Sequence, residues 1–278
     1  GGANFDVNER DSLTYVAAER VYMRGDTADA RNSFLRYLQT FPEGAFSLNA
    51  NYYIGLIDYN QQNYASAAPY LNKVLEYPNN KYSEEAMMMS AEIAYIAKDY
   101  VQSLEWYKLL KDRASTPERR QIAATGMLRS AAMSGNGEET ILAATAVLAD
   151  AKVAPELESE ARHYRSKALV EANQLTHAVA DWEALAKDTR NVYGAEAKYR
   201  LAQYLFDAGK TAEAEKEVLN YLEVSTPHAY WLARSFVLLS DIYAKLDRKL
   251  EARQYLLSLK QNYQADDDIA GMIESRLE

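Results

Sequence analysis

Small and apolar residues recur along this chain at intervals of 36 to 38 residues. One small residue opens each amphipathic segment, and its successive positions are 37, 36, 37, 38, 36 and 38 residues apart. We call these residues the markers: Ala30, Ala67, Ser103, Thr140, Ala178, Ala214 and Ala252. A fixed period of this length indicates an array in which each repeat is one supersecondary unit.

Each marker begins an apolar stripe with helical spacing. The residues four and seven positions later are mostly apolar: Phe34/Tyr37, Leu71/Val74, Tyr107/Leu110, Ala144/Val147, Trp182/Leu185, Val218/Tyr221 and Leu256/Leu259. Positions i, i+4 and i+7 share one face of a helix. About twelve residues before each marker lies a second small or apolar residue, where an earlier helix could approach closely: Ala18, Gly55, Ala91, Leu128, Ser166, Ala202 and Ser240. The pattern predicts two helices per repeat.

Helix-breaking residues fall between the predicted helices. Five of the six prolines lie 11 to 15 residues after a marker, where a second helix must end. Gly25, Gly135 and Gly209 lie just before a marker, where a tight turn would join the two helices. We therefore expect about seven helical hairpins.

The combination of a small residue, an aromatic residue four positions later, a third apolar position and a closing proline resembles the tetratricopeptide repeat. The period of about 37 departs from the 34 residues of that family, and no repeat has a Trp early in its first helix. The segments 34–35, 41–44 and 49–55 are also similar to repeats of Tol–Pal-associated periplasmic proteins and outer-membrane-assembly lipoproteins of Gram-negative bacteria. The resemblance implies an all-α fold, a right-handed α–α superhelix.

The repeat boundaries divide the chain into a tail, an array and a last helix. We expect residues 1–10 to be an N-terminal tail and residues 266–278 to be a capping helix that begins at Asp266-Asp267-Asp268. A truncation within a longer repeat array is the alternative at that end. The repeats lie at about 11–47, 48–83, 84–120, 121–158, 159–194, 195–232 and 233–265.

Composition limits the function classes. The net charge of −9 argues against a nucleic-acid binder, which needs a basic surface. The chain has no Cys, which excludes disulfides and thiolate metal sites. No stretch approaches the roughly 20 apolar residues that cross a bilayer. The start at Gly1-Gly2 has neither a Met nor an apolar signal segment, so a targeting segment would lie outside this sequence.

Candidate catalytic chemistry is sparse. His163, His177 and His228 lack metal-ligand spacing, and Gly209-Lys210-Thr211 lacks the glycine and the preceding strand of a phosphate-binding loop. We therefore predict no catalytic residue, metal site or cofactor, and no enzyme. A helical-repeat hydrolase with two facing carboxylates is the enzymatic alternative.

The family resemblance implies that partners bind along a concave face lined by the first helices. The Tyr-rich composition of the early repeats suits recognition, because Tyr combines a large apolar ring with a hydroxyl. Filling of the space between helices is the alternative role for these rings. The predicted partner-binding residues are Tyr15, Glu19, Tyr22, Tyr52, Leu56, Tyr59, Met88, Glu92, Tyr95, Arg129, Lys167, Tyr199, Gln203 and Phe206.

The leading functional hypothesis is a non-catalytic scaffold or adaptor that binds a protein or peptide. The acidic balance favours a basic or neutral partner. The resemblance suggests a periplasmic or outer-membrane-associated location, with the cytoplasm as the alternative. A structural segment of a larger repeat protein, without a ligand of its own, is the second hypothesis.

Overall fold

A computed structural model describes residues 2–224 and 226–278, with side chains from Asp6 onward. This part of the chain forms fifteen helices and no strand, which confirms the all-α helical-repeat fold. The helices are α1 (Gly2–Met23), α2 (Thr27–Thr40), α3 (Ser47–Asn60), α4 (Tyr64–Glu76), α5 (Ser83–Ile96), α6 (Tyr100–Arg113), α7 (Pro117–Ser134), α8 (Gly137–Leu148), α9 (Pro155–Glu171), α10 (Leu175–Leu185), α11 (Val192–Asp207), α12 (Thr211–Glu223), α13 (Ala229–Lys245), α14 (Lys249–Asn262) and α15 (Ile269–Leu277).

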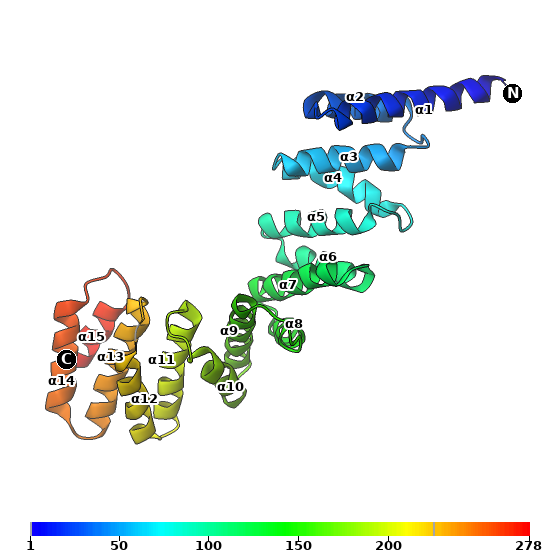
Figure 1. Cartoon of the computed structure of the whole chain (residues 1–278). Coiled ribbons are helices and arrows are strands. Elements are labelled where there is room, and N and C mark those ends of the chain that lie inside the picture. The colour runs from blue at the N-terminus through cyan, green and yellow to red at the C-terminus, as the bar shows by residue number, and fades with distance from the viewer. Residues whose placement is uncertain (1, 225) are drawn as a thin grey trace. The chain divides into compact units, whose positions relative to one another are not determined.

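The chain divides into two compact units, Gly1–Ser134 and Gly135–Glu278. The first contains α1 to α7 and the second contains α8 to α15, and within each unit consecutive helices pack on one another (Figure 1). The division falls inside the fourth predicted repeat, 121–158, so the hairpin of that repeat stays a prediction. Residues 2–10, which we expected to be a tail, belong to α1.

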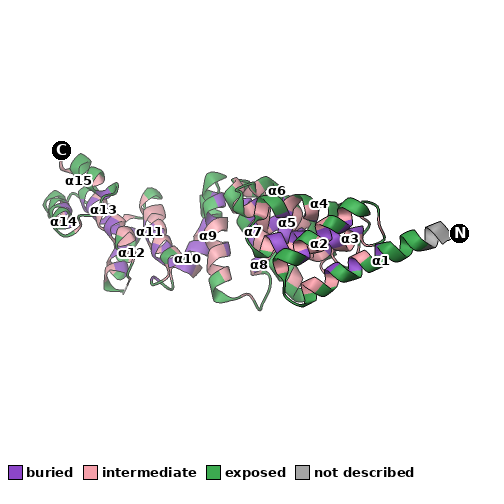
Figure 2. Ribbon diagram, turned by 90° about the horizontal axis from the view of Figure 1, so that it is seen from above, coloured by how far each residue is buried: buried purple, intermediate pink, exposed green. Residues whose placement is uncertain are grey.

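The apolar stripe of the repeat forms the core. All seven markers and all seven residues twelve positions before them are buried. The residues four and seven positions after each marker are also buried, with Tyr107 as the one exception. Figure 2 shows the buried residues as purple bands along the helices. Each helix therefore contributes one apolar face to its neighbours, as a helical-repeat array requires.

The turn inside each repeat has a left-handed residue at a constant place. Five residues before each marker φ is positive, between 60° and 85°, at Gly25, Gln62, Lys98, Gly135, Asn173, Gly209 and Asp247. In six of these turns the N–H of the left-handed residue reaches back three residues and the next N–H reaches back five. This is the Schellman ending of a helix, which satisfies its last carbonyl groups.

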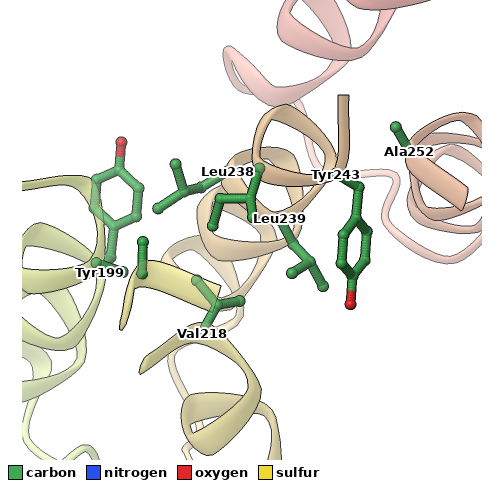
Figure 3. Close-up of a cluster of buried hydrophobic side chains, with 9 residues drawn as sticks. Tyr199, Val218, Leu238, Leu239, Tyr243 and Ala252 are labelled. Atoms are coloured by element: carbon green, nitrogen blue, oxygen red, sulfur yellow. The ribbon is translucent and has the colours of Figure 1, made fainter. Parts of the chain in front are cut away.

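The C-terminal helices show how one element covers the next. Figure 3 shows Val218, Leu238 and Leu239 gathered between α11, α12 and α13 in one buried cluster. In the same unit α15 packs on α13 and α14, where Ile269 and Ile273 are buried. The last helix thus covers the apolar face of the hairpin before it.

Candidate functional site

Within the first unit, a pocket of about 520 Å³ lies between the first helices of the third and fourth repeats. We call it the α5–α7 pocket. It brings together Glu92, Tyr95 and Arg129, three of the predicted partner-binding residues. The residues that line it are Glu92, Tyr95, Tyr107, Gln121, Ile122, Thr125, Gly126 and Arg129.

This pocket arises from a change at one repeat position. Tyr53, fourteen residues before the marker Ala67, stacks on Phe34, four residues after the preceding marker Ala30, with ring centroids 5.2 Å apart. The corresponding residue over Tyr107 is Gly126. A Cβ at Gly126 would lie 2.5 Å from the Tyr107 ring, so this ring rests directly on the α7 backbone. Tyr107 is therefore only half-buried and forms the floor of the pocket.

The α5–α7 pocket is lined by both charged and hydroxyl-bearing side chains. The Tyr59 hydroxyl donates a hydrogen bond to Glu92. Burial and then Glu92 raise the pKa of Tyr107 to about 12, while Arg129 lowers it. Tyr107 therefore stays protonated at neutral pH, and the pocket presents hydroxyl groups, a carboxylate and a guanidinium.

Within the second unit, a pocket of about 450 Å³ lies at the equivalent repeat position, between the first helices of the fifth and sixth repeats. We call it the α9–α11 pocket. Its floor is Trp182, which follows its marker by four residues as Tyr107 does, and Arg200 occupies the position of Gly126. The lining residues are His163, Ser166, Lys167, Val170, Glu171, Leu175, Trp182, Glu196, Arg200, Gln203, Tyr204 and Asp207. The predicted residues Lys167 and Gln203 lie here.

Two side chains of the α9–α11 pocket are held by their own neighbours. The Arg200 guanidinium lies 3.7 Å from Glu196 and 5.4 Å from the centre of the Trp231 ring. His163 stacks on Tyr193 at 4.1 Å between ring centroids. Burial lowers the pKa of His163, so its imidazole is uncharged at neutral pH.

The outward placement that we expected for Tyr15, Tyr52 and Tyr199 is wrong. These side chains are 2%, 9% and 3% exposed and pack inside the two units. All three lie fifteen residues before a marker, which is one helical turn before the buried small residue of the first helix. Residues three apart share a helix face, so this position also faces inward.

Most other predicted residues are half-buried between neighbouring first helices. Tyr22, for example, contacts Tyr53 with ring centroids 4.8 Å apart, and Lys245 lies over the Phe206 ring. The half-buried residues outside both pockets are Glu19, Tyr22, Leu56, Tyr59, Met88 and Phe206. Many of the Tyr-rich positions therefore fill space between helices, the alternative that the sequence left open.

The two basic candidate residues lie in separate pockets. Arg129 and Lys167, the nearest basic residues along the predicted face, belong to different units. In the described part of the chain, no group of three His, Asp or Glu residues could hold a metal ion. No helix among those described is both long and apolar enough to cross a bilayer. Sequence reasoning missed Tyr107 and Trp182 as pocket residues, although Gly126 at a position otherwise held by larger side chains was a usable signal.

Comparison with known proteins decides the family. A model of the tetratricopeptide repeat matches residues 15–81, 52–117 and 165–230, which together make up more than half of the chain. The chain belongs to the tetratricopeptide repeat family. This assignment supports a protein-interaction scaffold, and the fold is generally a non-catalytic interaction repeat.

Two solved structures, with TM-scores of 0.54 and 0.50, agree at the level of the fold. The chain is similar to the Naa15/Naa10 structure bound to HypK-THB (14% identity, TM-score 0.54), covering 97% of this chain and 39% of that one. It is also similar to the apo quorum sensor NprR of B. thuringiensis (10% identity, TM-score 0.50; 98% of this chain and 81% of that one). A tetratricopeptide repeat protein from Parabacteroides merdae ATCC 43184 aligns at 13% identity with a TM-score of 0.48, over 97% of this chain and 100% of that one. A comparison with curated protein sequences found no match.

Proposed function

We propose that this tetratricopeptide-repeat chain is a non-catalytic adaptor that binds a polypeptide partner along the face formed by its first helices. The observation that carries the proposal is the recurrence of a pocket at the same repeat position in each unit. Both pockets open between consecutive first helices, and both have an aromatic floor four residues after a marker. A partner segment that follows the first helices of either unit would meet the pocket of that unit as a side-chain subsite.

The cell envelope of a Gram-negative bacterium is the proposed location. Support for it is the similarity of segments 34–35, 41–44 and 49–55 to repeats of Tol–Pal-associated and outer-membrane-assembly proteins. The net charge of −9 favours a neutral or basic partner, since charge complementarity steers association.

Capture from a Gram-negative envelope extract tests the proposal. The test variant combines Ile122→Asp with Arg129→Glu, two exposed residues of the α5–α7 pocket. The matched control combines Val101→Asp with Arg113→Glu, two exposed residues of α6 outside the pocket. Both variants exchange one branched apolar residue for Asp and one Arg for Glu, so the change in total charge is the same.

The expected result is a partner that the parent and the control retain and the test variant loses. Circular dichroism should show the same helix content for all three proteins. A partner that binds the test variant as well as the parent would place binding on another surface. A partner lost equally by both variants would indicate attraction by total charge instead of a site.

A further inference from the structure

The α9–α11 pocket has a chemically uneven lining. Part of its lining is apolar, with Trp182, Tyr204 and the half-exposed Leu175. The centroids of the Trp182 and Tyr204 rings lie 6.4 Å apart. A volume of about 450 Å³ beside these rings accommodates one long side chain.

Two carboxylates lie at one end of this pocket. Glu171 is the last residue of α9 and Asp207 is the last residue of α11, and both are exposed. The C-terminus of a helix carries partial negative charge, which adds to the charge of these side chains. Asp207 also accepts a hydrogen bond from Gln203 at 2.9 Å, which leaves its other carboxylate oxygen for a ligand.

The cations of the pocket cancel this charge only in part, because the lining has three carboxylates against Lys167 and Arg200. Arg200 is placed over the Trp231 ring and beside Glu196. His163 is uncharged at neutral pH, as described above. Lys167 is the remaining cation, and its exposed side chain begins one helical turn before Glu171.

The geometry points to this pocket as the binding site for a basic side chain, Arg or Lys, of the polypeptide partner. The aliphatic part of that side chain packs on Trp182 and Tyr204, and its charged end reaches Glu171 and Asp207. An aromatic face attracts a cation and the carboxylates pair with it, so one occupant satisfies both parts of the lining. The inference rests on the proposed function and names the residue type that the partner presents.

Short peptides test the inference without the unknown partner. The probe is the blocked tripeptide acetyl-Leu-Arg-Leu-amide, and its two comparisons replace Arg by citrulline, which is neutral, or by Glu. Binding is followed by NMR at the indole N–H of Trp182, assigned with Trp182→Phe. The Arg peptide should shift this signal saturably, and the citrulline peptide should bind about threefold or more weakly because it lacks the charge.

Substitutions of the charged pocket residues should change the affinity for the Arg peptide in different directions. Glu171→Gln and Asp207→Asn should each weaken binding of the Arg peptide by up to about fivefold, the range of a solvent-exposed ion pair. Lys167→Gln should strengthen it, because a repelling charge is removed. Glu223→Gln and Asp266→Asn remove exposed acids outside the pocket and are the matched controls.

Several results would overturn the inference. They are an absent shift at Trp182, tighter binding of the Glu peptide, weaker binding after Lys167→Gln, or equal effects of the pocket and control substitutions. Capture of a partner in the envelope experiment together with any of these results would leave the proposed function intact. Failure of the proposed function would instead be seen in the capture experiment, independently of the results with the peptides.

Discussion

Single buried charges hold neighbouring helices of this protein together. Asp181 on α10 is 1% exposed and accepts hydrogen bonds from Arg162 at 3.1 Å and from Arg165 at 2.7 Å, both on α9. This pairing raises the pKa of Arg165. Loss of this carboxylate would leave two partly buried guanidinium groups with longer hydrogen bonds, from Arg162 to Glu158 at 3.3 Å and from Arg165 to Thr145 at 3.2 Å.

We therefore expect Asp181→Asn to lower the free energy of unfolding by about 3 kcal/mol, the lower end of the cost of breaking a buried pair. Urea unfolding followed by circular dichroism measures it. Glu274→Gln breaks the exposed pair with Lys260 and should cost less than about 1 kcal/mol. Equal effects of the two substitutions would show that Asp181 is not a structural anchor.

His163 makes the stability of the second unit depend on pH. Its pKa is lowered from the ordinary value of 6.5 by burial, with Lys167 and Arg200 adding to the shift and Glu196 opposing it. The unfolded chain therefore takes up a proton at a higher pH than the folded chain does. This contribution to stability is complete above pH 6.5 and is lost as the pH falls from 6.5 toward the lower folded pKa.

Urea midpoints at about pH 7.5 and about pH 5.5 test this expectation. The parent should lose more stability than His163→Asn between these two values. His177→Asn, at an exposed residue of α10, supplies the matched control. An identical pH dependence of the parent and His163→Asn would contradict the expectation.

At the scale of the helix, the sequence predicted where the turns lie, but it did not identify most of the left-handed residues in them. Glycine marked three of the seven left-handed positions, whereas Gln62, Lys98, Asn173 and Asp247 gave no such signal. A non-glycine residue adopts this left-handed conformation at a cost of roughly 1–2 kcal/mol. The packing of the surrounding helices offsets that cost. The constant distance from the markers, and not residue type, identifies these turns.

Replacement of such a residue by glycine should therefore stabilise the protein. Lys98→Gly removes the strain at φ 63° and keeps the backbone hydrogen bond to Tyr95. The expected gain is about 0.5–1 kcal/mol, since glycine also has more freedom to lose on folding. Ala17→Gly in the exposed middle of α1 should instead cost about 1 kcal/mol. The same sign for both substitutions in urea unfolding would refute this account.

The packing of α7 against α6 depends on the absence of a side chain at Gly126. Gly126→Ala should lower the free energy of unfolding by about 1 kcal/mol or more, because the new methyl group displaces the Tyr107 ring. In a Tyr107→Ala background the same change should raise it by about 1 kcal/mol, the helix propensity of Ala over Gly. Urea unfolding of the parent, the two single variants and the double variant gives a double-mutant cycle. If Gly126→Ala changes the free energy of unfolding in the same direction in both backgrounds, the contact between Gly126 and the Tyr107 ring is ruled out.

At the scale of the whole molecule, the period along the chain predicted the repeat fold but not the surface that it presents. The fold follows from small and apolar residues that every repeat shares. The α5–α7 pocket arises where one repeat departs from the pattern, so it depends on a pair of residues from adjacent repeats, Tyr107 and Gly126. The buried Tyr15 and Tyr52 were misplaced because a helix face was assigned from family geometry instead of from the distance to Ala18 and Gly55.

The fourth repeat deviates from the repeat pattern at its marker and along its apolar stripe. Its marker is Thr140, its stripe carries only Ala144 at the aromatic position, and the family model leaves residues 118–164 unmatched. The division into two units, after Ser134, lies in the same segment. Each unit has its own buried clusters, and a cut there keeps α7 packed on α6 and α8 packed on α9.

Because the stability of a repeat array is a sum over neighbouring elements, we expect fragments 1–134 and 135–278 each to fold alone. Each should be helical by circular dichroism and unfold in urea in one cooperative transition, and their two spectra should add up to that of the chain. Fragment 1–98 is the control, since it leaves α5 without α6 and exposes Met87, which packs with Leu110. It should be less stable than 1–134. A broad transition or low helix content in fragment 135–278 would mean that the second unit needs the first in order to fold.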